Sequence, residues 1–120
     1  MGKSLRRRDD NQTETLTPAQ DFAMNLEQFQ ASLNQPQPPT ELPLALTALW
    51  WDAKGNWTKA HECAQQRETP HHAWVHAYLH RKEGDVDNAR YWYGRAGKPV
   101  FAGPLEEEWK RIAEALLEKQ

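Results

Sequence analysis

Hydrophobic residues recur at helical spacing near the start of the chain, within a mainly polar sequence. Four of them follow one another at intervals of four, three and four residues: Phe22, Leu26, Phe29 and Leu33. This spacing places side chains on one face of an α-helix. Thr17 and Pro18 precede the pattern and are typical of an N-cap and a first helical position. We therefore predict a first helix over residues 17–34.

The same periodicity returns in the middle of the chain, where we predict two helix-turn-helix hairpins over residues 42–67 and 69–97. Their turns, Gly55-Asn56-Trp57 and Gly84-Asp85-Val86, lie 29 residues apart. Glycine adopts the left-handed conformation that ends a helix, and asparagine or aspartate caps the next helix. Alanines stand at matching offsets before and after each turn: Ala48, Ala60, Ala77 and Ala89. The chain therefore contains an internal repeat of 29 residues.

The remaining segments complete an all-α prediction. Residues 35–41 are rich in proline and are expected to form an extended connector. Residues 104–119 are predicted to form a closing helix, because one face is hydrophobic and acidic residues fill the first turn. Residues 1–16 hold too few hydrophobic residues to be ordered by burial, so we expect a disordered arm. Residues 17–120 are then a single helical domain.

Composition excludes several classes of function. The formal net charge is −2, so no basic field favours nucleic acid. No apolar run approaches the roughly 20 residues that span a bilayer, and the basic N-terminus leads into aspartates instead of the apolar stretch of a secretory signal. Cys63 is the only cysteine, which fits a reducing compartment. We expect a cytoplasmic protein that binds neither nucleic acid nor membranes. Motifs for nucleophilic catalysis and phosphate binding are absent, so we expect no enzyme and no cofactor.

The hairpins resemble the tetratricopeptide repeat. In the second hairpin the resemblance is carried by residues 84–89 (Gly-Asp-Val-Asp-Asn-Ala), followed by Tyr93 and Ala96, with Ala77 in the preceding helix. In the first hairpin the matching positions are Ala48, Trp51, Gly55, Trp57 and Ala60. The chain departs from that family in its period of 29 rather than about 34 residues. It also departs at three positions where the family has leucine, tyrosine and alanine: His76, His80 and Arg67.

A second resemblance covers roughly residues 42–118. The runs LWWDAKGNWTKAHE and AWVHAYLHRKEGDVDNARYWYGRAG are similar to those of a group of small, uncharacterised bacterial proteins. That group brings no established activity with it. The resemblance therefore supports the fold and implies nothing about function.

Histidines are concentrated in one part of the chain. All five lie between His61 and His80, and three of them are spaced by four residues: His72, His76 and His80. Imidazoles at this spacing share a helix face and can chelate a metal ion. Further ligands would come from a neighbouring helix, with His61, Glu62 or Asp52 as candidates. We expect instead that His76 and His80 pack at a helix interface, and metal binding or a proton-linked switch remains the alternative.

Aromatic residues and arginines form a second candidate site. Trp74, Tyr78 and Arg81 share one helix face, which in tetratricopeptide repeats would line the concave side. Tyr91-Trp92-Tyr93 covers more than one face of the next helix, which also carries Arg95. We predict that this chain binds a protein or peptide partner at a single site formed by five of its residues: Trp74, Tyr78, Arg81, Tyr91 and Arg95. The alternative is that these side chains pack against other helices.

Three functional hypotheses follow. The first is an interaction module that binds a protein or peptide. The second is a metal-binding protein or metal-dependent enzyme that uses His72, His76 and His80. The third is a self-associating structural protein, because two hairpins are fewer than a repeat stack needs to bury its faces.

Overall fold

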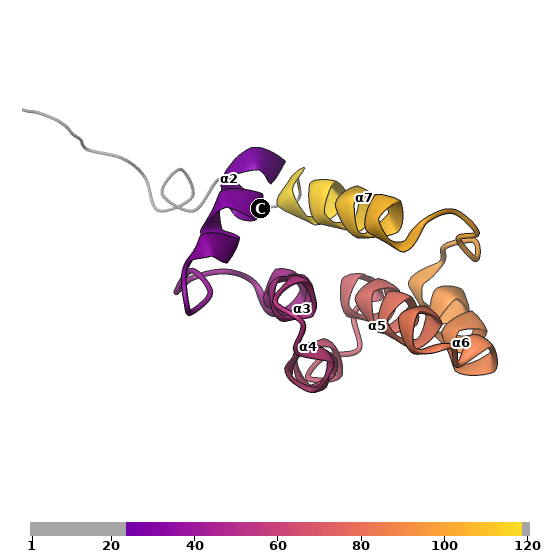
Figure 1. Cartoon of the computed structure of the whole chain (residues 1–120). Coiled ribbons are helices and arrows are strands. Elements are labelled where there is room, and N and C mark those ends of the chain that lie inside the picture. Colours follow the sequence, from indigo (N-terminus) through magenta and orange to yellow (C-terminus); the bar gives the residue numbers. More distant parts are fainter. Residues whose placement is uncertain (1–23, 119–120) are drawn as a thin grey trace, which may run out of the picture.

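The computed structural model describes residues 24–118, and in this range the chain is entirely helical (Figure 1). Its elements are α2 (Leu26–Ala31), the 3-10 helix η2 (Ser32–Asn34), α3 (Leu44–Ala53), α4 (Trp57–Ala64), α5 (Pro70–Glu83), α6 (Val86–Ala96) and α7 (Leu105–Glu118). No residue between 24 and 118 lies in a β-strand, so the predicted all-α class is confirmed. None of these helices combines the length and the apolar character needed to cross a membrane.

Within the described residues, the helix predicted over 17–34 contains a separate helix start at Asn25. Asn25 has an extended backbone, with φ −94° and ψ 176°, and it caps α2. Its Oδ1 accepts a hydrogen bond from the Gln28 N–H at 2.8 Å, and Gln28 Oε1 accepts one from the Asn25 N–H at 3.0 Å. This reciprocal capping stabilises a helix start, so the described residues 24–34 do not form one continuous helix. The start signal at Thr17 and the expected arm over residues 1–16 lie outside the described residues.

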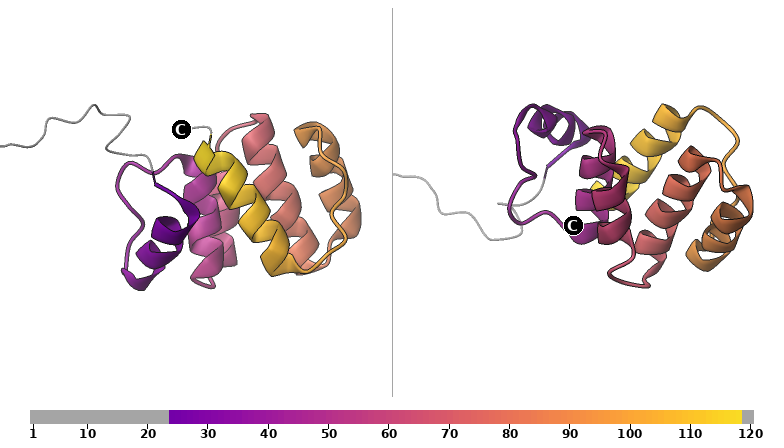
Figure 2. Two further views of the ribbon diagram at one scale, coloured as in Figure 1. Left: turned by 90° about the horizontal axis from the view of Figure 1, so that it is seen from above. Right: turned by 60° about the horizontal axis from the view of Figure 1, so that its bottom comes forward.

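The two predicted turns occur where the glycines indicated. Gly55 and Gly84 have φ of +84° and +90°, and the side chains of Asn56 and Asp85 cap α4 and α6. Helix α3 packs against α4, and α5 packs against α6. Helix α7 then returns across α5 and α3, so these two helices lie between α7 and the α4 side of the molecule (Figures 1 and 2).

Replacing Gly84 with alanine tests the turn between α5 and α6. The left-handed backbone at φ +90° strains any residue with a Cβ, so we expect Gly84→Ala to lower the free energy of unfolding by roughly 1–2 kcal/mol. Gly94→Ala is the matched control, because Gly94 lies inside α6 and an added Cβ would meet no atom within 4 Å. Alanine should stabilise that helix by up to about 1 kcal/mol. Urea denaturation measures the free energy of unfolding of both variants. Equal changes in the two would contradict the left-handed conformation of Gly84.

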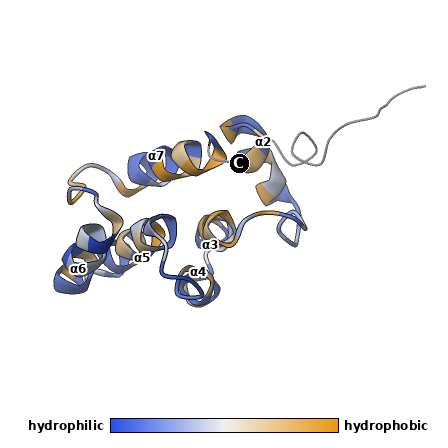
Figure 3. Cartoon of the chain, turned by 180° about the vertical axis from the view of Figure 1, so that it is seen from behind, coloured by the Kyte–Doolittle hydropathy of each residue, from blue (hydrophilic) through white to orange (hydrophobic). Residues whose placement is uncertain are grey.

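Tryptophans hold the core together at the junction of α2, α3 and α7. The Trp50 side chain is completely buried, and its Nε1 donates to Ser32 Oγ at 3.1 Å. Trp109 stacks on Phe29 with ring centroids 5.6 Å apart, and its Nε1 donates to the Leu49 carbonyl at 3.0 Å. Each buried indole therefore has a partner for its polar N–H. Hydrophobic residues are prominent on α3, whereas α4 and α6 are mainly hydrophilic (Figure 3).

Helix α5 is buried on most of its circumference. Eight of its residues are buried: His72, Ala73, Val75, His76, Ala77, Tyr78, Leu79 and His80. His76 and His80 share one face, and Tyr78 and Lys82 share another about 200° away, because consecutive helical residues are separated by about 100°. This single helix therefore presents different side chains to the helices on its two sides.

Candidate metal centre at the histidine cluster

Three histidines from two helices meet in one cluster, which we call the histidine cluster: His61 of α4 and His76 and His80 of α5. The Nε2 atoms of His61 and His76 are 3.0 Å apart, so one ring donates a hydrogen bond to the other. One ring nitrogen from each of the three histidines lies within 4.8 Å of the other two. His76 and His80 are buried, and His61 is half-buried. The three imidazoles can therefore direct nitrogens at a common point.

Two tryptophans fix the orientation of these rings. Trp57 stacks on His61 with centroids 4.8 Å apart and an interplanar angle of 10°. Its Nε1 donates to the Leu79 carbonyl at 3.0 Å, which anchors the start of α4 to α5. On the other side, Trp92 of α6 stacks on His76 at 4.0 Å and 14°. The cluster is thus enclosed by indoles from two different helices.

The surroundings favour neutral imidazoles. Burial, followed by the nearby His61 and His80, lowers the pKa of His76 to about 4. Burial, followed by His80, also lowers the pKa of His61. At neutral pH both rings are therefore neutral, which is the form that binds a metal ion, and metal binding would replace the hydrogen bond between their Nε2 atoms.

A carboxylate orients the third histidine. His80 Nδ1 donates to Glu83 Oε2 at 2.8 Å, one helical turn away on α5. This hydrogen bond leaves Nε2 of His80 as the free nitrogen. Histidines that bind metals in proteins commonly donate their second ring N–H to a carboxylate in this way, which fixes the tautomer and the ring orientation.

His72 does not belong to the cluster, although the sequence placed it on the same face as His76 and His80. Its Nδ1 donates to the Ala64 carbonyl at the end of α4, at 3.0 Å. His61 occupies the third position instead. The sequence also predicts His61 as a candidate from a neighbouring helix, together with Glu62, which is exposed, and Asp52, which binds Tyr78 and Lys82. The four-residue spacing from Trp57 to His61 was the available signal for this choice.

The five residues predicted to bind a partner do not form one surface. Tyr78 is 2% exposed and donates to Asp52 Oδ2 at 2.9 Å. Arg81 donates from Nε to Glu108 Oε1 at 2.9 Å and from Nη2 to the Gly103 carbonyl at 3.1 Å. Tyr91 and Arg95 lie on the surface of α6, where Arg95 Nη1 donates to the Tyr91 hydroxyl at 2.9 Å. Trp74 is half-buried beneath the ammonium of Lys98. Tyr78 and Arg81 thus have partners within the molecule.

Comparisons with known proteins add no assignment, because the chain matches no protein-family model, no curated protein and no solved structure. The functional argument consequently depends on the geometry of the histidine cluster itself.

Proposed function

We propose that this protein binds a divalent transition-metal ion through His61, His76 and His80. The observation that carries the proposal is the convergence of three imidazole nitrogens, all within 4.8 Å of one another. Nitrogens that bind one tetrahedral zinc ion at about 2.0–2.1 Å lie about 3.3 Å apart. The His61–His76 separation of 3.0 Å is already close to this value. Small side-chain adjustments would therefore assemble a three-nitrogen site.

The donor set indicates which metals fit. Imidazole suits zinc, copper and nickel, whereas calcium and magnesium prefer oxygen ligands. Three histidines leave one tetrahedral position for water or an added ligand, which is the arrangement of a reactive zinc site. Glu83 would support the metal indirectly by holding His80 in place. We therefore propose Zn²⁺ as the first ion to test.

Zinc titration by calorimetry tests this proposal. The untagged protein should bind one Zn²⁺ per chain. Binding should be lost in the His76→Ala, His80→Ala double variant, because two of three ligands are removed. His71→Ala is the matched control, since His71 is exposed at the start of α5 and should leave binding unchanged. Circular dichroism of the metal-free variants verifies that they remain helical. Equal stoichiometry in the double variant would overturn the proposal.

One further pair of variants separates the observed cluster from the ligand set predicted by sequence. His61→Ala should weaken zinc binding at least about tenfold, as expected for a lost ligand. His72→Gln should leave it within about twofold, because His72 donates to the Ala64 carbonyl. If His72→Gln weakened zinc binding more than His61→Ala did, the metal ligands would instead be His72, His76 and His80.

The fold that carries this site is proposed to be a divergent pair of tetratricopeptide-like hairpins. Two observations support this. The left-handed glycines at Gly55 and Gly84 are 29 residues apart. The alanines at the matching offsets are all at most 2% exposed: Ala48, Ala60, Ala77 and Ala89. Binding of a protein or peptide, and self-association, stay predictions. They have less support than metal binding because Tyr78 and Arg81 have partners inside the molecule.

A further inference from the structure

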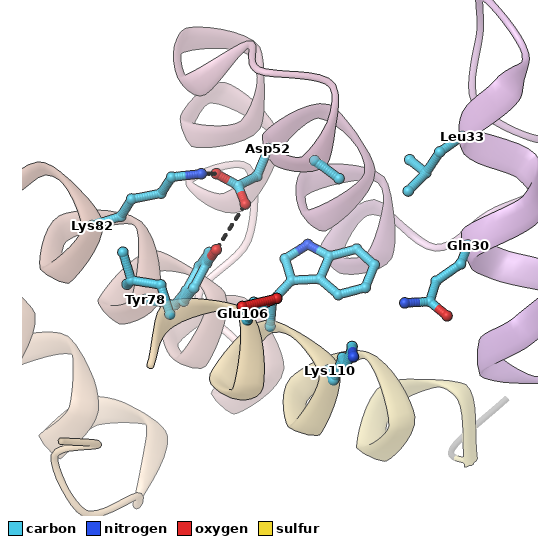
Figure 4. A pocket seen from close by; sticks show the side chains of 10 residues that line it. Gln30, Leu33, Asp52, Tyr78, Lys82, Glu106 and Lys110 are labelled. Carbon is cyan, nitrogen blue, oxygen red and sulfur yellow. Dashed lines mark hydrogen bonds and ion pairs between the residues drawn. The ribbon is translucent and has the colours of Figure 1, made fainter. Parts of the chain in front are cut away.

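A second site lies on the opposite face of α5, in a pocket of about 400 Å³ between α2, η2, α3, α5 and α7 (Figure 4). Tyr78 and Lys82 of α5 contribute to its wall, together with Asp52 at the end of α3. Trp109 and Leu105 of α7 and Leu33 of η2 add apolar surface. The volume is at the small end of the range for pockets that hold small molecules.

One end of the pocket is polar and carries both signs of charge. The Asp52 side chain is only 3% exposed, and its two oxygens accept hydrogen bonds from Tyr78 Oη at 2.9 Å and Lys82 Nζ at 2.8 Å. Each carboxylate oxygen keeps capacity for another donor, and the lysine ammonium keeps two unused N–H groups. Burial and the neighbouring Asp52 raise the pKa of Tyr78 far above its usual value, so its hydroxyl stays protonated. This end can therefore pair with an ammonium and a carboxylate at the same time.

The other end is apolar. Leu33 lies across the pocket from Asp52 (Figure 4), and Trp109 also lines the pocket wall. The indole N–H is already bonded to the Leu49 carbonyl, so Trp109 offers its ring and not a polar group. Three further polar side chains, which are at most partly buried, also line the pocket: Gln30, Glu106 and Lys110. A ligand that reaches from end to end would thus be charged at one end and hydrophobic at the other.

We infer that this pocket binds a small zwitterion with an apolar side chain, the chemistry of a free amino acid such as leucine. Its ammonium would approach the Asp52 carboxylate, its carboxylate would approach Lys82, and its side chain would lie between Trp109 and Leu33. The inference is independent of the histidine cluster, which faces α4 and α6 from the other side of α5. Either proposal can fail while the other stands.

The test is a titration with L-leucine followed by nuclear magnetic resonance, with EDTA present so that no metal ion contributes. Two analogues serve as probes of the charged groups: N-acetyl-L-leucine lacks the ammonium, and L-leucinamide lacks the carboxylate. Leucine should shift the indole N–H signal of Trp109 and leave that of Trp57 unchanged. Both analogues should bind at least about tenfold more weakly, because each lacks one of the two charges that would pair with Asp52 and Lys82.

A blocking variant completes the test. Ala53 lines the pocket at the exposed end of α3, so Ala53→Phe should fill it and weaken leucine binding at least about tenfold without unfolding the protein. Thr58→Phe is the matched control, because Thr58 is an exposed residue of α4 outside the pocket. Absence of leucine binding, or equal effects of the two variants, would overturn the inference. Binding of N-acetyl-L-leucine as tight as that of leucine would also overturn it, by showing a site for carboxylates alone.

Discussion

Replacing Glu108 with alanine should lower the free energy of unfolding by about 3–5 kcal/mol, the cost of breaking a buried ion pair by removing one partner. The Glu108 side chain is 1% exposed and joins three elements. It accepts a hydrogen bond from Arg81 of α5 at 2.9 Å and another from the Tyr93 hydroxyl of α6. Burial, followed by Glu108, raises the pKa of Tyr93, so that hydroxyl donates at any physiological pH. Alanine would leave the buried Tyr93 hydroxyl and the half-buried Arg81 Nε without this acceptor.

Urea denaturation measures this effect, and the adjacent residue provides the control. Glu107 and Arg111 form an ion pair at 3.0 Å, but their side chains are 48% and 63% exposed. Glu107→Ala should therefore change stability by at most about 1 kcal/mol. Glu108→Gln should fall between the two variants, because the amide keeps an acceptor oxygen but loses the charge that pairs with Arg81. A loss below about 1 kcal/mol in Glu108→Ala would show that α7 is not held by this network.

Acidification should destabilise the metal-free protein through His76. Its pKa is about 4 in the folded chain and 6.5 when unperturbed, so the unfolded chain takes up a proton first as the pH falls. The contribution of the neutral ring to the free energy of unfolding is therefore complete above about pH 6.5 and is lost progressively between pH 6.5 and 4. Each pKa unit corresponds to about 1.4 kcal/mol, so this residue should account for roughly 3 kcal/mol. Further protonation below pH 4 should add little from His76.

The variant His76→Gln isolates this contribution from the other groups that titrate in the same range. The charged or titratable neighbours of His76 are His61 from α4 and His80 from its own helix, while α6 presents the uncharged Trp92. We expect urea denaturation to show that the free energy of unfolding falls between pH 7 and pH 4 in both proteins. The fall should be roughly 3 kcal/mol smaller in the variant than in the parent protein. Identical losses in both proteins would mean that His76 is accessible to protons in the folded state.

The sequence determined the positions of the two turns and the helices around them. Gly55 and Gly84 are the residues that adopt a left-handed backbone, and Asn56 and Asp85 cap the following helices, as their residue types predict. These signals are local, because a cap or a left-handed turn depends on a few neighbouring residues. The helix start at Asn25 was missed because the hydrophobic spacing continues across it from Phe22 to Leu26, and the spacing gave no sign of a cap.

The candidate site depended on packing between helices that are distant along the chain. Four-residue spacing placed His72, His76 and His80 on one face, yet their partners differ. His72 donates to a carbonyl at the end of α4, whereas His76 and His80 meet His61 from the middle of α4. Similarly, Arg81 and Tyr78 have the residue types of a binding surface, but buried carboxylates on α7 and α3 engage them. Helical periodicity fixes only the direction in which a side chain leaves its own helix. The group that it meets is decided by how the helices pack.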